Sequence, residues 1–140
     1  MRRPSEEVIK DIEKFDAIRD GWPKLDSLVN ELKASPTPVQ GIDALLGVFE
    51  RHPGATSGSG VLMTVLHTLE ALPGYAIHLV ESLRRRPSVF AVMMVNRLLN
   101  SRVTHVGADS LIQLLEDTKA HPRCQRAVKA EIESVLEGRF

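Results

Sequence analysis

The chain has 140 residues, 43% of them hydrophobic and 26% charged, enough for one globular domain with a substantial core. Lysine plus arginine equals aspartate plus glutamate at 18 each, and the zero formal net charge argues against a dedicated nucleic-acid binder. The single cysteine, Cys124, excludes an intramolecular disulfide and fits a reducing compartment. The charged N-terminus shows no signal peptide and the apolar runs are too short for a bilayer, so we expect a cytoplasmic protein without membrane contact.

The first third of the chain predicts three helices. We expect Ser5 to cap the first, whose apolar stripe runs at helical spacing to Ile18. After the interruption at Gly21-Trp22-Pro23, a second helix follows. Its inward residues are Leu25, Leu28, Val29 and Leu32. We expect Thr37 and Gln40 to form a capping box at the start of a third helix that reaches about His52.

Residues 53–60 form a glycine-rich loop. A phosphate-binding loop of the Walker type needs a lysine that is not present here, and a dinucleotide fingerprint needs a glycine where Met63 stands. We therefore interpret this segment as a linker.

The remaining residues predict five more helices, at about 61–72, 75–85, 88–99 and 109–119, and from Pro122 to Gly138. The break at Arg86-Pro87-Ser88 follows from proline, which suits a first helical turn and excludes the preceding residue from helix. The helix from Ser88 is apolar almost all round, so other elements must cover it.

These patterns together predict an all-α domain spanning residues 1–140. No segment shows the alternation of a half-buried strand. Eight short helices with short loops are typical of antiparallel neighbours stacked in pairs, and we expect an α-solenoid similar to HEAT or armadillo repeats.

The residue types that carry catalysis do not form a known pattern. The five histidines include no metal-binding pair, and Cys124, which we place one turn into the last helix, has no general base assigned by any motif. We therefore expect no enzyme activity, no metal and no cofactor.

Polar residues form stripes on otherwise apolar helices. Thr64, His67, Thr68 and Ala71 share one side of a helix. His78, Glu81, Ser82 and Arg85 share a side of the next, and Asn96, Arg97 and Asn100 are the polar positions of the third. Because buried polar groups must be paired, the stripes either hydrogen-bond between helices or face a groove that receives a partner.

The centre of the chain resembles a family of small all-α immunity proteins from bacterial polymorphic-toxin systems, including contact-dependent growth inhibition. The resemblance runs from about Trp22 to Leu115. It is carried by the segments 60–63, 66–70, 73–75, 82–90 and 96–100, the last two reading SLRRRPSVF and NRLLN. It implies a cytoplasmic protein that binds one cognate toxin C-terminal domain, usually a nuclease, and blocks it, with no catalytic residue.

A basic nuclease cleft would meet carboxylates on its inhibitor, and the stretch between Arg51 and Arg84 has no lysine or arginine. Aromatic residues and arginine are frequent interface anchors. The residues we expect to contact a partner are Asp43, Glu50, His67, Glu70, Tyr75, His78, Glu81, Asn96 and Arg97. The alternative function is a HEAT-like scaffold or adaptor that binds a peptide or a regulatory protein in its groove.

Overall fold

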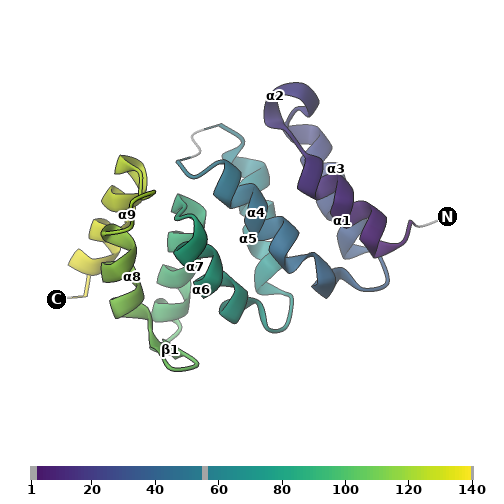
Figure 1. Cartoon of the computed structure of the whole chain (residues 1–140). Coiled ribbons are helices and arrows are strands. Elements are labelled where there is room, and N and C mark those ends of the chain that lie inside the picture. The colour runs from purple at the N-terminus through teal and green to yellow at the C-terminus, as the bar shows by residue number, and fades with distance from the viewer. Residues whose placement is uncertain (1–2, 55–56, 140) are drawn as a thin grey trace. The chain divides into compact units, whose positions relative to one another are not determined.

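The computed structural model of the chain describes residues 3–54 and 57–139 (Figure 1). Helices make up 71% of the described residues, so the protein is all-α, as the sequence predicts. The described residues divide into two compact units, one of residues 3–48 and 57–75 and one of residues 49–54 and 76–139. The pairwise solenoid stacking and the single domain expected from the sequence stay predictions.

The first unit is built around a central helix. Its helices are α1 (Ser5–Lys14), α2 (Ala17–Asp20), α3 (Trp22–Lys33), the 3-10 helix η1 (Pro38–Gly41), most of α4 (Ile42–Arg51), and α5 (Ser59–Glu70). α3 packs against both α1 and α5, and η1 packs against α1 and α3. The inward stripe predicted for α3 is confirmed, since Leu25, Leu28, Val29 and Leu32 are buried. Burial of each such side chain contributes about 1.5–3 kcal/mol to the stability of the folded state.

The first helix is shorter than its apolar stripe predicts. α1 ends at Lys14, and Asp16 starts a new turn by accepting the backbone N–H groups of Ile18 and Arg19, both at 2.9 Å. Ile18 is consequently 99% exposed, so its predicted place on the inward stripe is wrong. A local side-chain hydrogen bond to the backbone has outcompeted continuation of the helix.

Two predicted caps are also wrong, although the helix starts lie close to the predicted places. Ser5 is the first residue of α1, where its hydroxyl lies 2.6 Å from the Ser35 hydroxyl and accepts the Thr37 N–H at 2.9 Å. Thr37 precedes η1 but makes no side-chain cap hydrogen bond, so the capping box with Gln40 is not formed. Ser5 therefore joins α1 to the turn after α3 instead of capping its own helix.

The second unit follows the predicted helix boundaries closely at its start. Its elements are the end of α4, α6 (Tyr75–Arg85) from residue 76 on, α7 (Val89–Asn100), β1 (His105–Val106), β2 (Asp109–Ser110), α8 (Leu111–Lys119) and α9 (Arg126–Glu137). The break at residues 86–88 is confirmed, and the Ser88 hydroxyl caps α7 by accepting the Ala91 N–H at 3.2 Å. α9 packs against both α7 and α8.

The apolar helix α7 lies in the core of this unit, as its composition predicts. Phe90, Ala91, Val92, Met94 and Val95 are buried. The Phe90 ring stacks on Phe49, with centroids 5.4 Å apart and an angle of 21° between the ring planes. The covering elements therefore include the C-terminal end of α4 as well as α9.

Two features of the second unit differ from the sequence prediction. A small antiparallel hairpin pairs His105 with Ser110 and Val106 with Asp109, so α8 begins at Leu111 and not at 109. Two-residue strands are too short to show alternation. α9 begins at Arg126 instead of Pro122, which places Cys124 in the preceding turn, where its N–H bonds the His121 carbonyl at 3.0 Å.

Candidate partner-binding surfaces

The nine residues expected to contact a partner are divided between the two units. Asp43, His67, Glu70 and Tyr75 belong to the first unit. Glu50, His78, Glu81, Asn96 and Arg97 belong to the second. The three polar stripes predicted from the sequence have three different roles in the structure.

The stripe on α5 faces a groove. Its four residues line a hollow of about 380 Å³ in the first unit, which we name the α5 groove. The lining residues are Lys33, Thr64, His67, Thr68, Ala71 and Leu72. Of the two arrangements that the sequence left open, this stripe adopts the one that faces a groove.

The threonines of the α5 groove are satisfied by their own helix. The Thr64 hydroxyl donates to the Gly60 carbonyl at 3.3 Å, and the Thr68 hydroxyl donates to the Thr64 carbonyl at 2.8 Å. Because these protons are used within the helix, the groove presents mainly methyl groups together with Ala71 and Leu72. Such a surface suits an apolar side chain of a partner.

A titratable pair lies at the end of α5. The His67 Nδ1 atom is 3.7 Å from the Glu70 Oε1 atom, and this contact is an ion pair only when the imidazole is protonated. The His67 side chain is 59% exposed, whereas that of Glu70 is 21% exposed. His67 therefore stands at the accessible rim of the groove.

The stripe on α6 instead bonds to another helix. The Ser82 hydroxyl donates to the Glu50 Oε2 atom at 2.8 Å, and Arg85 donates through Nε to Oε1 at 3.1 Å and through Nη2 to Oε2 at 2.7 Å. The Glu50 side chain is only 13% exposed. Glu50 thus joins α4 to α6, whereas Glu81, which precedes Ser82 on the α6 stripe, is exposed.

The stripe on α7 is bound by the C-terminal end of the chain. Arg139 donates through Nη2 to the side-chain oxygens of Asn96 at 2.6 Å and Asn100 at 2.9 Å. Its Nε atom is buried and has no hydrogen-bond partner within the described residues. Arg97, the third member of the stripe, is exposed. No pattern in the sequence singles out Arg139, which follows the last helix.

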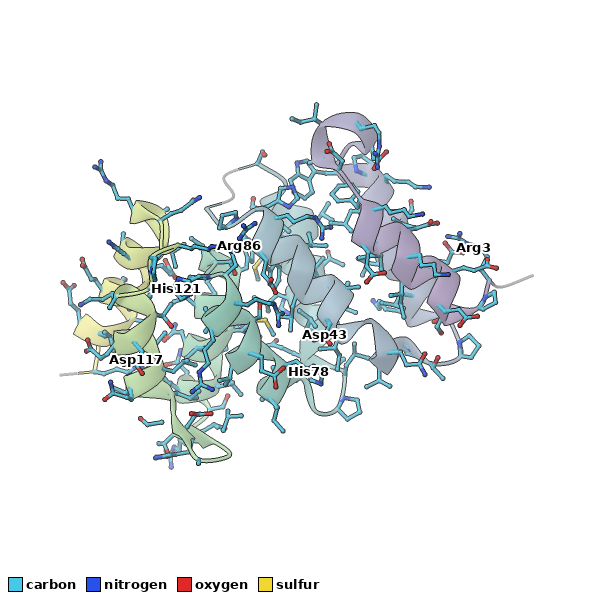
Figure 2. All side chains as sticks on the ribbon, in the orientation of Figure 1. Arg3, Asp43, His78, Arg86, Asp117 and His121 are labelled. Atoms are coloured by element: carbon cyan, nitrogen blue, oxygen red, sulfur yellow. The ribbon has the colours of Figure 1, made fainter. Side chains whose placement is uncertain are left out.

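The remaining candidates lie at helix starts or on partly exposed faces. Asp43 is exposed in the first turn of α4, where a carboxylate is favoured by the helix dipole (Figure 2). Tyr75 is the half-buried first residue of α6, and His78 is half-buried one turn later. Asp43 and Glu81 are therefore the carboxylates among the candidates that are most accessible.

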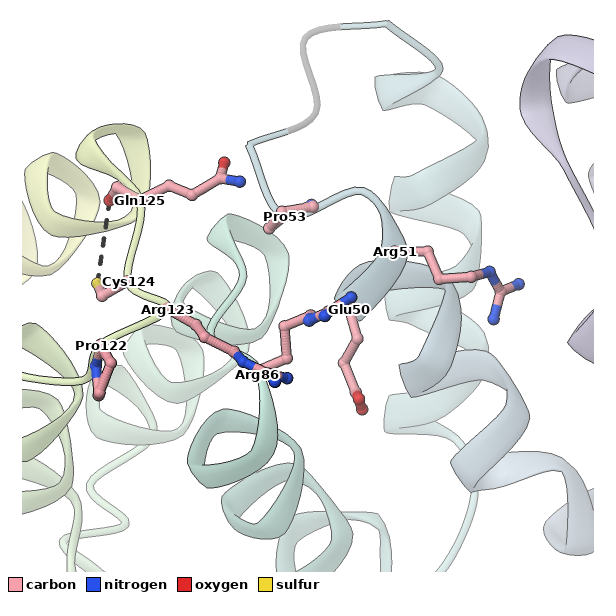
Figure 3. Close-up of a pocket in the computed structure, with 8 residues that line it drawn as sticks. All are labelled: Glu50, Arg51, Pro53, Arg86, Pro122, Arg123, Cys124 and Gln125. Atoms are coloured by element: carbon pink, nitrogen blue, oxygen red, sulfur yellow. Dashed lines mark hydrogen bonds between the residues drawn. The ribbon is translucent and has the colours of Figure 1, made fainter.

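A second hollow was not anticipated from the sequence. It measures about 520 Å³ and lies wholly in the second unit, and we name it the arginine pocket (Figure 3). Its lining residues are Glu50, Arg51, Pro53, Arg86, Pro122, Arg123, Cys124 and Gln125. The sequence shows Arg86 only as a helix-end cation and Arg123 only as a neighbour of Cys124. Their meeting depends on how α4, α6 and the turn before α9 pack.

Cys124 is a poor nucleophile in this setting. The residue is 8% exposed, and burial raises the pKa of the thiol, an effect that the charge of Lys129 only partly opposes. Within residues 3–54 and 57–139, histidine, cysteine, aspartate and glutamate form no group of three or more that would hold a metal ion. Over the same residues, none of the helices combines the length and the apolar character that crossing a bilayer requires.

Comparison with known proteins returns no relative for this chain. We found no match among protein-family models, among curated protein sequences or among solved structures. The resemblance of the central segment to immunity proteins therefore stays a prediction.

Proposed function

We propose that this protein is an immunity protein, which binds the C-terminal domain of a cognate bacterial toxin in the cytoplasm and neutralises it by tight association. The observation that carries this proposal is the α5 groove. Its lining combines the apolar residues Ala71 and Leu72, of which Ala71 is exposed, with the exposed polar residues Lys33 and His67. Apolar area bordered by polar residues is usual in protein interfaces.

The position of the groove in the sequence also supports the proposal. Residues 66–70, one of the segments on which the resemblance to immunity proteins rests, form the C-terminal half of α5 beside the groove. A family resemblance that coincides with a concave surface is what an inhibitor scaffold would require.

Charge complementarity with a basic toxin also supports the proposal. A nuclease toxin is basic where it binds nucleic acid, and complementary carboxylates raise the association rate more than they raise affinity. Asp43 and Glu81 are exposed and suit this role. Glu50 is a weaker candidate because Ser82 and Arg85 already bind its carboxylate.

The α5 groove also favours the alternative function, an adaptor that binds a peptide of a regulatory partner. An amphipathic segment with one or two apolar anchors fits a hollow of about 380 Å³. The two functions differ in what the occupant does: a toxin kills the cell when it is left unbound, whereas an adaptor's ligand does not.

The decisive experiment is growth rescue. The immunity function predicts a toxin gene next to this one. The C-terminal domain of that toxin is to be expressed in a bacterial host with and without this chain, and we expect growth only when the two are expressed together. Ala71→Arg fills the groove and should abolish rescue. Ala130→Arg, at an exposed position of α9, is the matched control and should rescue like the wild type. Failure of the wild-type chain to rescue would exclude the immunity function.

Association kinetics test the charge contribution separately. Asp43→Lys and Glu81→Lys should each slow association about threefold to tenfold at low salt, and the difference should shrink as salt screens the charges. Glu13→Lys, an exposed charge reversal on α1, is the control and should leave the rate unchanged. Equal rates for all three variants would contradict the carboxylate assignment.

A further inference from the structure

The arginine pocket carries an excess of positive charge. Arg86 and Arg123 reach it from the α6–α7 turn and from the turn before α9, and Figure 3 shows both extending towards Glu50 while Arg51 extends away from them. Over residues 3–54 and 57–139, neither the Arg86 nor the Arg123 side chain has a hydrogen-bond or ion-pair partner. Two unpaired guanidinium groups therefore converge on one hollow.

The carboxylate in the pocket does not offset this charge. Both oxygens of Glu50 accept hydrogen bonds from Arg85, at 3.1 and 2.7 Å, and one also accepts the Ser82 hydroxyl at 2.8 Å. Since Arg85 neutralises Glu50, the charges of Arg86 and Arg123 remain for a ligand. Guanidinium groups bind phosphate through paired hydrogen bonds with a planar fork geometry.

The start of α9 lies beside the pocket. Gln125, which lines the pocket, is the N-cap residue of this twelve-residue helix and makes no side-chain cap hydrogen bond. The first amide groups of a helix point outward and favour an anion. This contribution supports the arginines and would not make a site without them.

Backbone contacts fix the segments that carry the two arginines. The Val89 N–H donates to the Pro53 carbonyl at 2.7 Å, which ties the segment after Arg86 to the end of α4. The His121 Nδ1 atom accepts the Arg123 N–H at 2.9 Å, so the Nε2 atom carries the proton and donates to the Arg84 carbonyl at 2.8 Å. The backbone at both arginines is therefore held before binding, so that a ligand has to order only the two exposed side chains.

We propose that the arginine pocket binds a phosphate group carried by a small organic molecule. The phosphate lies between Arg86 and Arg123, where two positive charges match a dianion. The hollow of about 520 Å³ is larger than a phosphate ion and falls in the range of small-molecule sites, so the organic part occupies the remaining space towards Pro53 and Pro122. This inference concerns the second unit alone and does not depend on toxin binding.

Calorimetric titration of the full chain tests the site with three probes: inorganic phosphate, a nucleoside monophosphate and the same nucleoside without phosphate. We expect saturable binding of the nucleotide, weaker binding of phosphate and none of the nucleoside. Arg86→Gln and Arg123→Gln should each weaken nucleotide binding by about tenfold or more, because each removes a charge-assisted contact. Lys24→Gln, which removes one positive charge from the first unit, should bind like the wild type.

Several results would overturn the proposal. They are no saturation by nucleotide or phosphate up to about 10 mM, equal binding of nucleoside and nucleotide, or unchanged binding by both arginine variants. Phosphate binding as strong as nucleotide binding would refute the organic part of the ligand. Arg86 and Arg123 are exposed, so both variants should fold, and their far-ultraviolet circular dichroism spectra should match that of the wild type.

Discussion

Gly58 is the position where a single methyl group should do most damage to the first unit. It precedes α5 in the left-handed conformation, with φ 72° and ψ 13°. A Cβ atom there would lie 2.1–2.6 Å from three atoms of the Trp22 indole ring. The ring is itself packed against Phe15, with centroids 5.6 Å apart, so it cannot move aside without disturbing α1 and α3.

The expected cost of Gly58→Ala follows from two contributions. The left-handed conformation costs an alanine about 1 kcal/mol, and displacing a packed ring costs about 1–3 kcal/mol. The sum is about 3 kcal/mol, which corresponds to a fall in Tm of roughly 10 °C for a chain of this size. Trp22 is the only tryptophan, so its fluorescence reports unfolding of the unit where the change is made.

A matched glycine and a second substitution separate the two contributions. Gly60 lies inside α5, and among the described residues no atom apart from its chain neighbours and its own helix backbone lies within 4 Å of the position that an alanine Cβ would take. Gly60→Ala should therefore stabilise the protein by about 0.5–1 kcal/mol. Trp22→Leu removes the clash, and Gly58→Ala should then cost only about 1 kcal/mol in that background. A change within about 0.5 kcal/mol for Gly58→Ala in the wild type would refute the reasoning.

Three further predictions concern charge and burial. Glu50→Ala should destabilise the second unit by about 2–3 kcal/mol because it leaves the buried Ser82 hydroxyl without its acceptor. Arg85→Ala should cost about 1 kcal/mol or less, since the Arg85 side chain is 49% exposed. The free energies of unfolding are measured by chemical denaturation, and equal losses for the two variants would contradict this prediction. The hydrogen bond from Arg19 lowers the pKa of Asp20 to about 2. The stability that the Asp20 carboxylate gives the α2 turn is therefore present above pH 3.8 and is lost as the pH falls towards 2. NMR of the side-chain carboxyl group should show this titration, and a midpoint near pH 3.8 would contradict the prediction. Burial raises the pKa of the Cys124 thiol. At pH 8 this thiol should therefore react with a disulfide reagent at least about tenfold more slowly in the folded chain than in denaturant. Equal reaction rates would show that the thiol is accessible.

The sequence by itself determined the helical class and most helix boundaries. The α6 bounds and the break before α7 follow from residues within one or two turns of each other: the spacing of apolar side chains, the proline at 87 and the Ser88 cap. Proline excludes conformations locally, and an apolar stripe signals burial whatever it packs against. These effects act between residues close together in the sequence, so the sequence alone is enough to predict them.

Only the tertiary structure decided how polar side chains pair and where hollows form. Glu50 and Ser82 are 32 residues apart, and Arg86 and Arg123 meet because the turns that carry them are fixed through Pro53 and His121. Ile18 fits the α1 stripe by spacing, yet the hydrogen bonds of Asp16 turn the chain before it. Spacing along a chain describes one helix at a time, whereas the partner of a buried polar group is set by the packing of several helices.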